Sequence, residues 1–102
     1  MKREIINILT EIIKLLNQTN WIKQAEWYKL KLELIKKTNE QSCEFAYLLR
    51  EIDKSISGMG SFSDLPMKKE YSNTQWELSI KIVEVIKEYF NGNESNAPDW
   101  EF

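Results

Sequence analysis

The chain has 102 residues, one cysteine, no histidine and a net charge of −2. Its length suits a single domain, and the missing histidine excludes Ser–His and Cys–His catalysis and histidine-ligated metal sites. One cysteine excludes an internal disulfide and a multi-thiolate zinc site. The pI near 5.2 argues against the basic footprint of proteins that bind nucleic acid or anionic membranes. We therefore expect neither as a direct partner.

The N-terminal segment has no leader or membrane-span pattern, because Glu4, Asn7 and Glu11 interrupt its apolar residues. Cys43 has no histidine to activate it, so we expect a small core or boundary residue rather than a nucleophile. Cysteine use of this kind is typical of a reducing compartment. The sequence therefore predicts a cytoplasmic protein.

The first two predicted elements are helices. Residues 2–17 carry apolar side chains at i, i+3 and i+4 spacing, which predicts an amphipathic helix. Residues 21–37 predict a second helix, with Asn20 as its N-cap. The apolar residues of this second helix form two nearly opposite faces: Trp21, Ala25, Tyr28, Leu32 and Ile35, and then Trp27, Leu30 and Leu34. Such a helix either lies centrally in a bundle or keeps one face for a partner. We expect Trp21 to be a core residue.

A third helix is predicted over residues 39–54, because Thr38 and Gln41 have the spacing of a capping box. Residues 55–73 follow as the longest irregular stretch. Connections of this length inside a compact domain are uncommon and are often functional.

The last helix is predicted over residues 74–90, with capping-box spacing at Thr74 and Glu77. Residues 80–86 are rich in β-branched side chains and also fit a strand, but the 3.6-residue periodicity favours a helix. The apolar arc exceeds half of the circumference. We therefore expect this helix to be deeply buried, with Trp76 in the core.

Together these elements predict an all-α fold: a single-domain helical bundle of about four main helices, with a long Gly/Ser loop before the last helix. The bundle is expected over residues 1–92. An acidic, aromatic C-terminal tail follows over residues 93–102 and ends in Asp99-Trp100-Glu101-Phe102. Its two aromatic residues indicate docking on the body of the protein or on a partner.

Carboxylate chemistry is the enzymatic alternative. Glu40 and Glu44 lie one helical turn apart, and all-helical nucleotide pyrophosphohydrolases hold Mg²⁺ with helix-borne carboxylates. Those enzymes need a denser Glu-Glu-x-x-Glu set and a second Glu-x-x-Asp set, and this sequence has neither. We therefore expect no catalytic residues, no metal and no cofactor, and keep a small carboxylate metalloenzyme as a third hypothesis.

The segment Gly58-Met59-Gly60-Ser61-Phe62-Ser63-Asp64-Leu65 resembles the Gly-Met-Gly-Ser-x-x-Asp segment of small helical bacterial immunity proteins found beside polymorphic-toxin genes, including those of contact-dependent growth inhibition systems. The resemblance covers eight residues and extends loosely to the order of helices around them, with an early Trp27. It implies a cytoplasmic antidote. Such a protein binds the C-terminal domain of a cognate toxin, which we expect to be a nuclease, and blocks its active site or substrate cleft.

The charge distribution is compatible with that role, because residues 51–102 hold ten Asp or Glu and five Lys or Arg, and an acidic surface attracts a basic partner. The contact residues that we predict are Trp27, Ser61, Phe62, Asp64, Asp99, Trp100 and Glu101. The loop also fits a structural role, with Met59 and Phe62 plugging the bundle. We expect a monomer or weak dimer when the protein is alone. The alternative function is a helical adaptor that pairs through the second face of helix two.

Overall fold

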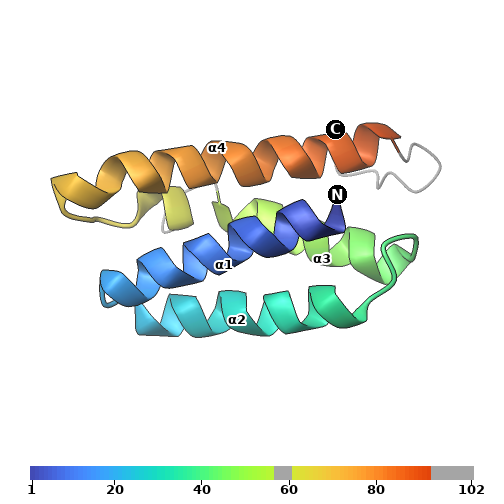
Figure 1. Ribbon diagram of the computed structural model, residues 1–102, viewed down its shortest axis with the longest axis horizontal. Coiled ribbons are helices and arrows are strands. Elements are labelled where there is room, and N and C mark those ends of the chain that lie inside the picture. Colours follow the sequence, from blue (N-terminus) through green and yellow to red (C-terminus); the bar gives the residue numbers. More distant parts are fainter. Residues whose placement is uncertain (57–60, 93–102) are drawn as a thin grey trace.

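The computed structural model describes residues 1–56 and 61–92, which form an all-α helical bundle (Figure 1). Within these residues it contains four α-helices and one short 3-10 turn: α1 (Lys2–Gln18), α2 (Ile22–Lys37), α3 (Cys43–Ile56), η1 (Phe62–Asp64) and α4 (Lys69–Gly92). α1 and α3 each pack against both α2 and α4. α2 and α4 therefore lie on opposite sides of the bundle (Figure 1). The expected all-α bundle is confirmed.

The core is built from one apolar stripe on each helix. α1 supplies residues at i, i+4 and i+7 spacing that are fully buried, among them Ile5, Leu9 and Ile12. α2 turns the first of its two predicted faces inward, from Ala25 to Ile35. Burial of these side chains is the main stabilising contribution, worth about 1.5–3 kcal/mol for each large residue. The stripe spacing thus decides which side of each helix faces the core.

The start of α2 differs from the prediction. Asn20 adopts a positive φ of 65°, a conformation that asparagine tolerates better than most residues. It therefore belongs to the turn that ends α1, and the N-cap of α2 is Trp21, without a side-chain cap bond. Trp21 is half-buried rather than central, and its indole Nε1 donates to the Pro66 carbonyl at 3.3 Å.

The start of α3 also differs from the prediction. The Thr38 hydroxyl donates back to the Leu34 carbonyl at 2.6 Å, so this side chain closes α2. The Ser42 hydroxyl accepts the backbone N–H of Phe45 at 3.2 Å, which is the bond of an N-cap to its third helical residue. The predicted Thr38 capping box is therefore wrong, because Ser42 competes for the same role four residues later.

α4 begins at Lys69, five residues before the predicted start. Thr74 and Glu77 consequently lie inside the helix and form no capping box. Pro66 marks the true boundary, since it cannot continue an incoming helix and restricts the residue before it. Residues 80–86 are helical, so the strand alternative is wrong. The 3.6-residue period outweighs the β-branched composition.

Polar contacts tie one end of the bundle together. The backbone N–H of Lys2 donates to the Glu40 carboxylate at 2.7 Å, and the Lys2 ammonium donates to the carbonyls of Lys36 and Thr38 at 3.1 and 2.8 Å. The Tyr89 hydroxyl donates to the Glu40 carbonyl at 2.8 Å. The bonds of Lys2 satisfy helix-end groups of α1 and α2 that have no partner within their helices. They hold the turn between α2 and α3 against both terminal helices.

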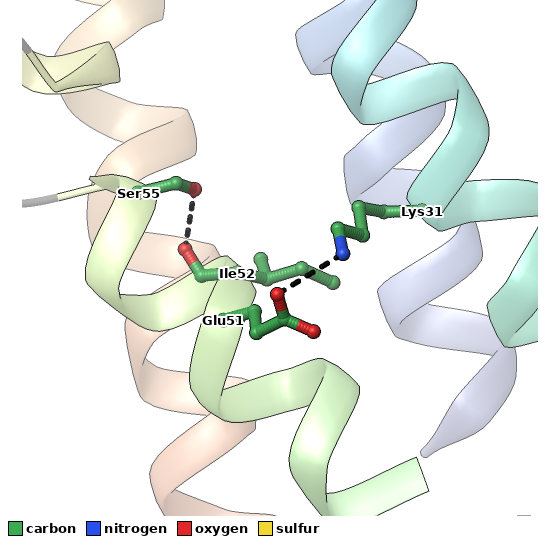
Figure 2. A network of polar contacts seen from close by, with 4 residues as sticks. All are labelled: Lys31, Glu51, Ile52 and Ser55. Carbon is green, nitrogen blue, oxygen red and sulfur yellow. Dashed lines mark hydrogen bonds and ion pairs between the residues drawn. The ribbon is translucent and has the colours of Figure 1, made fainter. Parts of the chain in front are cut away.

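Partly buried polar contacts also fix α2 against α3. Figure 2 shows the Lys31 ammonium beside the Glu51 carboxylate, 3.2 Å apart, and the Ser55 hydroxyl bonded to the Ile52 carbonyl at 2.6 Å. The Tyr28 hydroxyl lies 2.6 Å from the Ser55 hydroxyl. Burial raises the pKa of Tyr28 from 10.0 to about 12, although the bond to Ser55 acts in the opposite direction.

Alkaline pH should therefore destabilise the protein through Tyr28. The raised pKa means that the folded state holds this proton more tightly than the unfolded state does. Its contribution is complete below pH 10 and is lost as the pH rises from 10 towards 12. We expect a loss of about 2 kcal/mol across this range in urea unfolding. Y28F should lose less over the same range. An equal loss in both proteins would show that Tyr28 does not control the transition.

Candidate partner-binding surface

Among the described residues, large apolar side chains are exposed on several helices, of which α2 and α4 each carry more than one. On α2 they are Ile22, Leu30 and Leu34, exposed by 48%, 59% and 39%. On α4 they are Trp76 and Ile80, exposed by 63% and 39%. Scattered apolar residues are normal on a surface, but contiguous ones mark interaction sites. Both helix faces are therefore candidate binding surfaces.

The α4 face is hollowed. Trp76, Ile80 and Val83 follow one another at i, i+4 and i+7 and line a groove of about 310 Å³. The far wall comes from Ile56 at the end of α3 and from Ser63 of η1. Ser79, Glu84 and Lys87 complete the lining. The groove thus combines an apolar wall with a polar border contributed by two separate segments.

The expectation that Trp76 is a core residue is wrong. α1 and α3 cover the side of α4 that carries Leu78, Ile82 and Tyr89, all of which are buried. The apolar arc of α4 is wider than these neighbours can cover, so its second row begins at the surface with Trp76. The helix is buried on one side only, not deeply on both.

The segment with the family resemblance reaches this groove through η1. Its Phe62 is only 2% exposed and stacks edge-on against Tyr28, with ring centroids 6.1 Å apart. The ring is therefore unavailable to a partner, and the predicted structural role of Phe62 as a plug of the bundle is confirmed. Asp64 is exposed and Ser61 is half-buried on either side of this anchor. Both predicted contact residues lie beside the groove-lining Ser63.

A buried glutamine fixes η1 to α4. The Gln75 amide nitrogen donates to the carbonyls of Phe62 and Leu65 at 2.7 and 2.9 Å. Both bonds are buried, which makes them costly to lose. Because Gln75 immediately precedes Trp76, the same helical turn holds η1 and presents the exposed indole. The two walls of the groove are thereby set relative to each other.

Q75A should loosen this arrangement. Two buried carbonyls lose their donor, and we expect the free energy of unfolding to fall by about 2 kcal/mol. N73A is the control, because Asn73 is an exposed residue of the same helix and should change stability by less than about 0.5 kcal/mol. Chemical denaturation measures both. A loss for Q75A no larger than that for N73A would show that η1 does not depend on this amide.

The structure does not bring Trp27 into the groove. This ring is half-buried on α2, edge-on to Tyr28 at 4.9 Å, with the Lys31 ammonium 5.1 Å from its centroid. It belongs with Leu30 and Leu34 on the other exposed face. The remaining predicted contacts, Asp99, Trp100 and Glu101, lie outside the described residues, as does Met59.

Sequence reasoning missed the main lining residues of the groove: Trp76, Ile80, Val83 and Ser63. The apolar pattern of the last helix could have indicated this surface. An apolar arc wider than half of a helix exceeds what two neighbouring helices cover, so part of it has to be exposed or bound by a partner. The expected deep burial of the whole arc is therefore wrong for the row that begins with Trp76.

The residues considered for chemistry occupy structural or surface positions. Glu40 caps α1, and within residues 1–56 and 61–92 no three His, Cys, Asp or Glu side chains gather as metal ligands. Cys43 is exposed at the first position of α3. The expected core or boundary position of Cys43 is therefore wrong, because α3 starts later than predicted.

Comparison of the chain with models of known families, with curated proteins and with solved structures gives no match. Among the described residues, none of the helices combines the length and apolar character required to cross a membrane.

Proposed function

We propose that this chain is an immunity protein: a cytoplasmic antidote that binds a cognate bacterial toxin domain, expected to be a nuclease, and occludes its active site or substrate cleft. The observation that carries the proposal is the groove between α4 and η1. Ser63, from the segment that resembles immunity proteins, and the exposed Trp76 line the same groove. The function is binding, without a catalytic residue, metal or cofactor.

The groove has the properties of a binding surface. Tryptophan is among the residues most enriched at energetic hot spots, where its large ring fills a partner's pocket. Trp76 is the most exposed of the large apolar side chains in the part of the chain that the structure describes. Gln75 holds the facing wall in place before a partner arrives. A surface ordered in advance loses less conformational entropy on binding.

Co-purification tests this function. A tagged, catalytically inactivated form of the protein encoded immediately upstream would be co-expressed with this chain and the complex analysed by light scattering. We expect a stable complex with one antidote for each toxin domain. If the two proteins separate during purification at micromolar concentration, the immunity proposal is wrong.

The outer face of α2 supports a second candidate, a helical adaptor that forms homodimers. Leu30 and Leu34 are exposed there beside the half-buried Trp27, as expected for a helix with two apolar faces. An adaptor of this type should dimerise when purified alone, and L30A should reduce that dimerisation. Sedimentation at increasing concentration separates the two candidates, since we expect the antidote to be a monomer or a weak dimer.

A further inference from the structure

We propose that the outer face of α4 takes up an apolar anchor flanked by lysine or arginine side chains of the partner protein. The inference rests on the proposed function and names the chemistry of the partner at that same surface. The apolar part is the row formed by Trp76, Ile80 and Val83, which lines the groove. The charged part is a row of carboxylates on the side of α4 that faces α1.

The carboxylates follow the apolar row along the helix. Glu77, Glu84 and Glu88 are all exposed. At 100° for each residue they lie within about 40° of one another around the helix axis, next to Ile80. Among the described residues, none of the three forms an ion pair. Their charges are therefore available to a partner that binds over Trp76.

α1 extends this acidic border. Glu4 of α1 lies opposite Glu84 and Glu88 across a shallow groove of about 350 Å³. Lys81 is the single cation in the lining of that groove, whose other members are Asn7, Ile8 and Val85. One lysine beside three carboxylates leaves this side of α4 with net negative charge. A cationic partner is thus favoured over an anionic one.

The cation at the end of the apolar row does not reverse this preference. Lys87 lies one helical turn after Val83 in the same row and lines the groove, and its charge also acts on Asp53 of α3. Burial raises the pKa of the Asp53 carboxyl, and the positive charge of Lys87 opposes that rise. Lys87 therefore faces a carboxylate within the protein itself, and the groove border formed by Ser63 is uncharged.

A second copy of this chain is a poor occupant of the same surface. In a symmetric pair, each copy brings the same acidic row to the interface, and like charges that face each other reduce affinity. An anionic ligand meets the same repulsion. The charge pattern thus selects a different protein, one whose apolar anchor is surrounded by basic side chains.

Two designed peptides test this inference without the toxin. Both are 18-residue amphipathic helices with the same Leu/Phe stripe, but one is flanked by lysines and the other by glutamates. Fluorescence anisotropy at low salt would measure their binding to the full chain. We expect the lysine peptide to bind at least about tenfold more tightly, with a preference that shrinks as salt screens the charges. W76A should weaken binding of the lysine peptide.

Neutralising the acidic row tests whether these carboxylates cause the preference for the lysine peptide. E77Q/E84Q should remove most of the preference for the lysine peptide. E26Q/E44Q removes the same number of charges from exposed positions on α2 and α3 and should retain the preference. Equal binding of the two peptides, or equal effects of the two double variants, would overturn the inference. If the chain prefers the lysine peptide but does not co-purify with the upstream protein, the immunity function is contradicted and the inference about the charged partner stands.

Discussion

W76A is expected to weaken the proposed toxin complex by at least about 2 kcal/mol, which is roughly 30-fold in Kd, while barely changing the stability of the free protein. The indole is 63% exposed, so its removal leaves little new cavity in the core. Its remaining contacts with the protein should contribute less than about 1 kcal/mol to the free energy of unfolding. A large effect on binding together with a small effect on folding is characteristic of an interface residue.

L30A is the matched control for W76A. Leu30 is a large apolar residue of comparable exposure, 59%, and belongs to α2, the helix that lies opposite α4 in the bundle (Figure 1). Isothermal titration with the toxin domain and urea unfolding of the free protein would be measured for both variants. We expect L30A to bind like the unmodified protein. If L30A weakens the complex and W76A does not, the contact surface lies on α2.

The second large effect is expected from F62A, which should lower the free energy of unfolding by about 3–5 kcal/mol. The Phe62 ring is almost completely buried and packs against Tyr28. Its loss opens a cavity at the point where η1 meets α3 and α4. Thermal and urea unfolding would measure the change. Such a loss is a large fraction of the stability of a domain of this size.

Two comparisons make the Phe62 result interpretable if F62A fails to fold. F62L retains most of the buried volume and should cost less than F62A. Y47A removes an aromatic side chain that is 62% exposed and should cost less than about 1 kcal/mol. Equal losses for F62A and Y47A would show that the ring is not an anchor. The segment that resembles immunity proteins would then be a candidate contact surface instead of an anchor.

The helices themselves could be predicted because their apolar periodicity is strong. α1 and the buried face of α2 follow the predicted stripes, and residues 80–86 are helical despite their β-branched composition. Helix ends were less predictable. Three residues near helix ends can either cap one helix or close another: Asn20, Thr38 and Ser42. Which of these roles each residue takes depends on tertiary contacts such as those of Glu40.

The candidate surface was only partly predictable. The sequence shows that α2 and α4 each have more apolar surface than two neighbouring helices cover, but it does not show which row faces outward. That choice depends on where α1 and α3 lie, and on Gln75, which draws η1 onto α4. Ser61 is half-buried and Asp64 is exposed, and their role as partner contacts stays a prediction. Trp76, expected in the core, is exposed on α4, whereas Phe62, predicted both as a contact and as a plug of the bundle, is buried.

Growth of toxin-expressing cells tests the central claim most directly. The protein encoded immediately upstream would be expressed in active form, either alone or together with this chain, and colony formation would be counted. We expect toxicity from the upstream protein alone and full rescue by this chain. W76A, tested at equal protein level, should fail to rescue. Absence of toxicity, or toxicity that this chain does not relieve, would contradict the immunity function.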